Sequence, residues 1–179
     1  TTLSISISNH ILKSFLTPFP PALTKLELLR DHSKEVTFSA LASALPPALD
    51  SLKISFSVDI LQGDVLFKLP LLRKLSLACT TSRLDFLEAL PRDLEKLKLT
   101  VKSKARAKVF ERFWQVLPPS LTHLKLEIAS GLVPMLSPAL LRPNLTRLVI
   151  LVGGLVDHPN GGLMDYWKRL PNAEQVRIT

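Results

Sequence analysis

The sequence has 179 residues and a formal net charge of +8, and 46% of its residues are hydrophobic although only 6% are aromatic. This length is sufficient for one domain with a buried core, which leucine must build almost alone. The single cysteine, Cys79, excludes an internal disulfide, whereas the positive charge permits an acidic protein partner, a phosphate-bearing ligand or an anionic membrane surface.

The chain begins with a predicted strand, in which polar and apolar residues alternate from Thr2 to Ile7. The frame Pro-x-x-Leu-x-x-Leu-x-Leu then recurs seven times, in some copies one residue shorter after the proline, at spacings of 21 to 28 residues. A period in this range is typical of repeat proteins. The seven copies are Pro20 with Leu23, Leu26 and Leu28; Pro46 with Leu49, Leu52 and Ile54; Pro70 with Leu72, Leu75 and Leu77; Pro91 with Leu94, Leu97 and Leu99; Pro118 with Leu121, Leu124 and Leu126; Pro143 with Leu145, Leu148 and Ile150; and Pro171 with Ala173, Val176 and Ile178.

Each copy predicts one strand followed by a return segment. In runs such as Leu97-Lys98-Leu99-Thr100-Val101, a period of two puts the apolar side chains on one face of the strand. Equivalent strands of successive copies must run the same way, which predicts a parallel sheet with right-handed connections. Several returns have apolar residues at helical spacing and are predicted to be amphipathic helices that end at a proline, namely Leu84–Leu90, Val109–Leu117 and Leu163–Leu170.

This frame resembles the leucine-rich-repeat superfamily, whose core pattern is Leu-x-x-Leu-x-Leu-x-x-Asn/Cys-x-Leu, and the resemblance covers essentially the whole chain. It implies an α/β fold, a right-handed solenoid of horseshoe or arc shape. The resemblance places a parallel β-sheet on the concave face and short helices or irregular returns on the convex face. Residues 1–179 then form a single domain. Because both ends stop in strands without a polar capping repeat, we expect a fragment of a longer array.

The chain departs from the family pattern at the position that usually holds Asn or Cys. That position is filled here by Asp31, Ser57, Thr80, Lys102, Ala129 and Gly153. We therefore expect no asparagine ladder and less regular turns. The Leu-Pro-x-x-Leu opening is also similar to the repeats of bacterial effector proteins and to slime-mould FNIP repeats, but the longer period and the missing Phe-Asn signature assign the chain to neither subfamily.

Strand residues between the leucines, and those just after the first leucine, are predicted to point away from the core. One such position repeats as a column along the solenoid axis: Lys25, Ser51, Lys74, Lys96, His123, Arg147 and Gln175. The predicted partner-binding residues of this face are Lys25, Lys53, Arg73, Lys74, Lys96, Lys98, His123, Lys125 and Arg147, and Arg177 is a further basic residue there. The acidic residues on the same face are Glu27, Asp50, Glu95, Glu127 and Glu174.

Two interpretations of this mildly basic face are open. It steers an acidic partner toward the protein, or it is a solvated sheet face whose charges compensate one another across neighbouring strands.

No pattern in the sequence predicts catalysis, a metal site or a cofactor. His10, His32, His123 and His158 fall in different repeats without a second His or Cys at metal-ligand spacing. Cys79 fills a strand position that holds Phe56, Val101 or Ile128 in other repeats, which favours a small buried hydrophobe over a nucleophile. The Gly-Gly pairs at 153–154 and 161–162 lack the Lys-Ser/Thr of a phosphate loop and indicate turns.

The preferred hypothesis is a non-enzymatic scaffold that binds a protein partner through the concave sheet face, a site suggested by the family resemblance. One alternative is anion or nucleic-acid binding through the basic column and the loop Lys102–Lys108. Another is a purely structural segment of a larger protein, whose open strand edges pair with another copy. Nucleic acid is disfavoured because the outward strand positions hold no aromatic residue for base stacking.

Two further features concern location. Thr1–Ser8 lacks the apolar run of a signal peptide, which with the single cysteine favours an intracellular protein. The most apolar stretch, Leu145–Val156, is too short to span a membrane.

Overall fold

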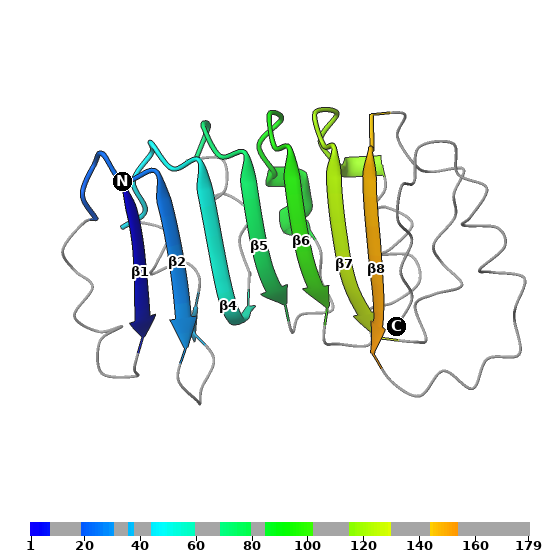
Figure 1. Cartoon of the computed structure of the whole chain (residues 1–179), viewed down its shortest axis with the longest axis horizontal. Coiled ribbons are helices and arrows are strands. Elements are labelled where there is room, and N and C mark those ends of the chain that lie inside the picture. Colours follow the sequence, from blue (N-terminus) through cyan, green and yellow to red (C-terminus); the bar gives the residue numbers. More distant parts are fainter. Residues whose placement is uncertain are drawn as a thin grey trace, which may run out of the picture.

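The structure is a computed structural model that describes residues 1–7, 19–30, 36–37, 44–59, 69–79, 85–101, 115–129 and 144–153. Seven described strands lie side by side in one parallel sheet, in the order in which they occur along the chain (Figure 1). They are β1 (Thr2–Ile7), β2 (Lys25–Arg30), β4 (Ser51–Asp59), β5 (Lys74–Cys79), β6 (Lys96–Val101), β7 (His123–Ala129) and β8 (Arg147–Gly153). Each repeat therefore packs against its neighbours in the sequence, as the repeat pattern predicts.

The second leucine of the repeat forms one buried row across the sheet. Consecutive members of the row are Cα partners on neighbouring strands, and each is only 1–2% exposed: Leu26, Leu52, Leu75, Leu97, Leu124 and Leu148. The third apolar position forms a parallel row that is 0–1% exposed, from Leu28 on β2 to Ile150 on β8. The prediction that the leucines share one spine is confirmed.

A tight turn precedes five of the described strands. The N–H of the first leucine donates to the carbonyl three residues earlier over 3.0–3.3 Å, which joins Leu23 to Pro20, Leu49 to Pro46, Leu72 to Leu69, Leu94 to Pro91 and Leu121 to Pro118. In the shorter copy the turn starts at Leu69, so Pro70 takes the second turn position that Pro47 and Pro119 hold in longer copies. Proline is favoured at that position because its fixed φ suits the turn. The frame therefore tolerates a one-residue difference without moving the strand.

Backbone carbonyls join the repeats where the strands begin. The carbonyl of the residue after the first leucine accepts two consecutive N–H groups of the next repeat over 2.8–3.2 Å; the acceptors are Thr24, Asp50, Arg73, Glu95 and Thr122, and Thr1 plays the same part for β2. Threonine hydroxyls reinforce this ladder, since Thr122 donates to the Glu95 carbonyl and Thr146 to the Thr122 carbonyl, both over 3.1 Å. The register between neighbouring repeats is thus fixed at the start of the strands.

The described return segments hold little helix. The predicted amphipathic helix Leu84–Leu90 is a five-residue 3-10 helix, η2 (Asp85–Ala89), which packs behind the sheet and buries Leu87 (Figure 1). This return belongs to the shortest repeat period, and a 3-10 helix advances further per residue than an α-helix. Gln115 and Val116 are helical at the end of the predicted helix Val109–Leu117.

Other predictions concern residues outside the described part of the chain. These are most of the helix Val109–Leu117, the helix Leu163–Leu170, the loop Lys102–Lys108 and the last copy, which runs from Pro171 and includes Glu174, Gln175 and Arg177.

β4 departs from the simple repeat register. Lys53 pairs with Ser76 of β5, but Ser57 pairs with Ala78, so β4 contains two more residues than β5 over this interval. The predicted equivalence of Phe56 with Cys79 is therefore wrong, because the Cα partner of Cys79 on β4 is Val58. Such a bulge bends a strand locally. The extra length pairs on its other side with β3 (Val36–Thr37), a two-residue strand that the repeat pattern does not predict.

Candidate functional site

The alternation of the strands sorts the outward side chains into two rows. The first row precedes the second leucine and comprises Lys25, Ser51, Lys74, Lys96, His123 and Arg147, and the second row follows it and comprises Glu27, Lys53, Ser76, Lys98, Lys125 and Val149. In β6 the burial alternates strictly, with Lys96 exposed, Leu97 buried and Lys98 half-buried. The leucines thus position these side chains on the opposite face of the sheet.

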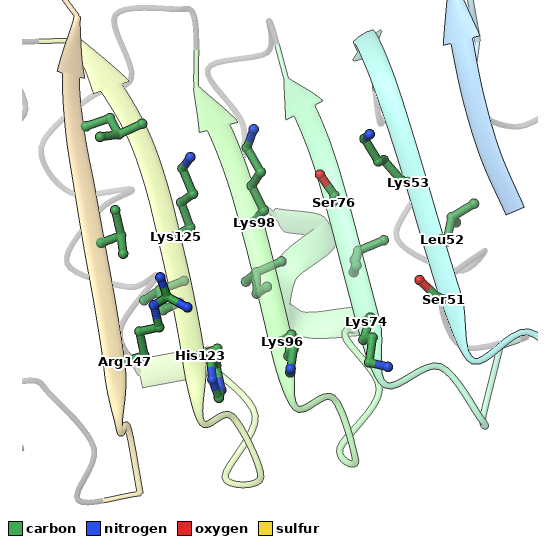
Figure 2. A pocket seen from close by; sticks show the side chains of 15 residues that line it. Ser51, Leu52, Lys53, Lys74, Ser76, Lys96, Lys98, His123, Lys125 and Arg147 are labelled. Carbon is green, nitrogen blue, oxygen red and sulfur yellow. The ribbon is translucent and has the colours of Figure 1, made fainter. Parts of the chain in front are cut away.

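The exposed face of β4–β8 is hollowed into an open groove of about 520 Å³ (Figure 2). Its walls come from five neighbouring strands. The lining residues are Ser51, Leu52, Lys53, Lys74, Leu75, Ser76, Lys96, Leu97, Lys98, His123, Leu124, Lys125, Arg147, Val149 and Leu151. In Figure 2 the labelled side chains of Lys74, Lys96, His123 and Arg147 stand near the start of the strands, and Lys53, Ser76, Lys98 and Lys125 stand further along them.

The structure brings seven of the nine predicted partner-binding residues together in this groove: Lys53, Lys74, Lys96, Lys98, His123, Lys125 and Arg147. The other two do not line it. Lys25 lies in the first row on β2, between the groove and the edge strand β1. Arg73 lies in the turn before β5, where its guanidinium is 4.0 Å from Asp50 and 3.6 Å from Glu95.

Carboxylates of neighbouring strands compensate part of the positive charge. Lys53 forms an ion pair and hydrogen bond with Glu27 on the adjacent strand. The ammonium of Lys74 is 3.8 Å from the Asp50 carboxylate. Lys98 and Lys125 share the Glu127 carboxylate at 3.0 and 3.5 Å. Exposed pairs of this kind contribute at most about 1 kcal/mol each, so their main effect here is on the charge that a partner meets.

The pKa of the Glu127 carboxyl is displaced by the groups around it. Partial burial acts to raise the pKa of its carboxyl, but a 2.7 Å hydrogen bond from the Thr100 hydroxyl, the hydrogen bond and charge of Lys98, and the charge of Lys125 outweigh it. The pKa of Glu127 therefore lies below its ordinary value. The carboxylate stays ionised and holds the two lysine side chains in place.

A pH titration of the Glu127 carboxyl is expected to show its interaction with Thr100 and the two lysines. Because the folded-state pKa of Glu127 is lowered, its contribution to stability is fully present above the unfolded-state pKa and is lost as the pH falls through the folded-state pKa. Removing the donor with Thr100→Val should raise the carboxyl pKa toward its ordinary value, as followed by the NMR shift of the Glu127 carboxyl carbon. Ser55→Ala, which alters an exposed hydroxyl on another strand, is the matched control. An unchanged Glu127 titration in Thr100→Val would contradict the assignment.

The comparisons with known proteins identify the architecture. The crystal structure of the leucine-rich repeat-containing protein LegL7 from Legionella pneumophila matches all of this chain with a TM-score of 0.55 and 14% sequence identity. The fold is a leucine-rich-repeat solenoid. The match covers 64% of the LegL7 chain, so the present chain spans less than two thirds of that protein. No protein-family model and no curated protein matches the sequence.

His123 occupies the first row of the solenoid between two basic residues. Its Nδ1 is 2.9 Å from the Thr122 hydroxyl oxygen. Since the single hydroxyl proton of Thr122 is directed at the Glu95 carbonyl, the hydrogen bond is satisfied when Nδ1–H of His123 donates to Thr122. The bond orients the imidazole on the outward face, between the strand positions of Lys96 and Arg147.

Sequence reasoning missed Leu151 as a lining residue of the solenoid groove and gave no binding role to Ser51, Ser76 and Val149. The repeat register could have identified Val149 and Leu151 as outward-facing residues of this surface. Val149 is the Cα partner of Lys125, and Leu151 is the partner of Glu127. Both β8 side chains are apolar where the equivalent residues of β6 and β7 are polar, so the groove changes from polar to apolar at its β8 side.

The side chains that line the groove are mainly cationic, hydroxyl-bearing or aliphatic. No three or more His, Cys, Asp and Glu side chains among the described residues are grouped so as to hold a metal ion. Nor does any helix among the described residues have the length and apolar character needed to cross a membrane. The predictions about His10, His32 and His158 concern residues outside the described part, and nothing is described of the Cys79 side chain.

Proposed function

We propose that this chain is a non-catalytic protein-interaction scaffold that binds a protein partner on the exposed face of its sheet. The observation that carries the proposal is the groove of about 520 Å³ across β4–β8. It is built on an invariant floor of buried leucines, whereas the side chains above the floor differ from strand to strand. A rigid base with varied contacts suits recognition of one partner surface.

The shape and composition of the groove favour a protein over a small molecule. Ligand pockets usually enclose most of their ligand, whereas this groove is open along five strands. Its long lysine side chains also cover apolar surface with their methylene stems, so they offer both contact area and charge. By this reading the sheet lies on the inner curve of the solenoid, where a partner touches several repeats together.

Affinity capture with this protein as bait tests the proposal. The triple variant Lys74→Glu, Lys96→Glu, Lys98→Glu should lose the captured partner, with affinity falling about tenfold or more. The comparison variant is Lys25→Glu, Arg73→Glu, Arg92→Glu, which changes the net charge equally at exposed cations outside the groove. It should keep the partner if the groove is the binding site, and it tests the sequence-based prediction that Lys25 and Arg73 also bind. If both triple variants keep the same partner with the same affinity, the exposed sheet face is not the binding surface.

Binding of a polyanion is the second candidate, because eight cations stand against four carboxylates at the outward positions of the described strands and at the residue that precedes each strand. The cations are Lys25, Lys53, Arg73, Lys74, Lys96, Lys98, Lys125 and Arg147, and the carboxylates are Glu27, Asp50, Glu95 and Glu127. The lining residues include no Phe, Tyr or Trp side chain that could stack on a base. A salt titration separates the candidates, since affinity for phosphates falls steeply and log-linearly with salt and a mainly apolar protein interface responds weakly.

A further inference from the structure

The cations of the groove divide into two groups according to whether a carboxylate accompanies them. Lys53, Lys74, Lys98 and Lys125 each have an acidic partner. Lys96 and Arg147 have none among the described residues, and both are exposed. A ligand that binds the first group must displace or share an existing ion pair, whereas a ligand that binds the second group meets two charges that no described carboxylate compensates.

The repeat register explains why these two cations have no carboxylate partner in the described part of the chain. Lys74 is paired with Asp50, which is the residue after the first leucine in the preceding repeat. The corresponding residue is Arg73 for Lys96 and Thr122 for Arg147. Neither offers a carboxylate. The ion pair that Lys74 of β5 makes with Asp50 therefore has no counterpart at Lys96 of β6 or at Arg147 of β8. Glu95, adjacent to Lys96 in the chain, lies 3.6 Å from the Arg73 guanidinium.

Lys96 and Arg147 stand on either side of one residue. His123 is the Cα partner of Lys96 on β6 and of Arg147 on β8. Neighbouring strands are about 4.8 Å apart, so the two Cα atoms are separated by roughly 10 Å, a distance that both long side chains can bridge toward a common anion. Figure 2 shows the three side chains on one face near the start of their strands.

An apolar surface adjoins this cation pair. Val149 and Leu151 follow Arg147 along β8, point to the same face and line the same groove, where both are half-buried. The second-row neighbours toward β6 are Lys125 and Lys98, whose shared carboxylate, Glu127, lies further along the strands. The part of the groove over β6–β8 thus offers the cation pair near the start of the strands and two aliphatic side chains further along β8.

We infer that the groove over β6–β8 binds an acidic peptide segment of a partner protein. A carboxylate of the segment lies over His123 between Lys96 and Arg147, and an apolar side chain of the segment packs on Val149 and Leu151. The Arg147 guanidinium suits a carboxylate because its planar donors match the two oxygens. This inference rests on the proposed function and specifies the chemistry of the partner.

The apolar half of the site is the reason to prefer a peptide to a nucleic acid. A phosphate backbone would use the two cations but would leave Val149 and Leu151 without a complementary group. An acidic peptide with an aliphatic residue two or four positions from its carboxylate satisfies both, because alternate side chains of an extended peptide point to one side.

Fluorescence anisotropy with defined probes tests the site. The probes are labelled decapeptides that carry Asp or Glu and, two or four positions later, Leu or Val; the same peptides with Asn or Gln in place of the acids; and a 20-nucleotide oligo-dT. The acidic-aliphatic peptides should bind, and their amide counterparts should bind about tenfold or more weakly. Failure of every acidic-aliphatic peptide to bind, or tight binding of oligo-dT that depends on Lys96 and Arg147, would overturn the inference.

Two charge-matched double variants locate the binding. Lys96→Gln with Arg147→Gln should weaken the acidic peptide about tenfold, while Lys53→Gln with Lys74→Gln, which removes the same charge from paired positions on β4 and β5, should weaken it by about threefold or less. Both should keep the parent melting temperature because the four residues are on the surface. If the second variant weakens the peptide as much as the first, the cation pair is not the anchor.

The same variants distinguish this inference from the broader proposal. A protein partner that is lost from the Lys74→Glu, Lys96→Glu, Lys98→Glu triple but retained by Lys96→Gln with Arg147→Gln would leave the exposed face as the binding surface and refute the peptide site. Loss from both agrees with the inference.

Discussion

Leu97→Ala is expected to lower the free energy of unfolding by about 2–5 kcal/mol. Leu97 is 2% exposed in the middle of β6, and its partners in the buried row are Leu75 on β5 and Leu124 on β7. Truncation removes apolar burial and leaves a cavity that the backbone ladders on both sides of β6 prevent from closing. Urea unfolding followed by circular dichroism measures the loss.

The exposed leucine Leu71 provides a matched control for the same chemical change. It is 60% exposed in the turn before β5, so Leu71→Ala should change the unfolding free energy by no more than about 0.5 kcal/mol. If Leu97→Ala and Leu71→Ala were equally stable, the buried row could not be the main source of stability. A large difference between them would also show that leucine count matters less than leucine position.

The buried rows were predictable because they depend on spacing alone. Alternation in Leu97-Lys98-Leu99 assigns each side chain to a face, and the repeat aligns that assignment from strand to strand. The same reasoning placed Lys96 and Lys98 on the open face, where the structure has them. One periodic pattern thus determined both the core and the outward rows.

The bulge in β4 was not predictable from the same pattern. Apolar and polar residues continue to alternate from Leu52 to Val58, so the sequence shows a long strand without showing that two residues are added relative to β5. The pairing with β3 is a long-range contact between residues that carry no repeat signature. Local periodicity does not specify such contacts, since they depend on how the return segment crosses the sheet.

The division of the cations into paired and unpaired groups was predictable from the sequence only in part. Charge compensation across neighbouring strands is found at Lys53 and Lys98, which carboxylates accompany, but not at Lys96 among the described residues. The steering of an acidic partner stays a proposal. The pairing of Lys53 with Glu27 follows from their direct opposition on adjacent strands. The diagonal contact of Lys98 with Glu127 requires knowledge of side-chain direction, which register alone does not provide.

Ser76→Pro is expected to disrupt the sheet although Ser76 points away from the core. Ser76 lies within β5 and pairs with Lys53 of β4 and Lys98 of β6, so both edges of its strand are occupied. Proline has no N–H to donate to the ladder, and leaving the acceptor without its donor costs about 1–3 kcal/mol before any steric clash is added. None of the 14 prolines of the chain lies in a described strand, which agrees with this restriction.

Ser76→Ala is the matched control, because it keeps the N–H and removes only the outward hydroxyl. Its unfolding free energy should stay within about 0.5 kcal/mol of the parent value, and urea unfolding compares the two variants directly. A proline variant as stable as the alanine variant would mean that β5 is not an interior strand. If Ser76→Pro disrupts β5 as expected, the groove loses its floor, because the backbone pairing of β4, β5 and β6 holds the lining residues at their spacing. Peptide binding should therefore fall in Ser76→Pro and persist in Ser76→Ala, because the site depends on the ladder rather than on the serine side chain.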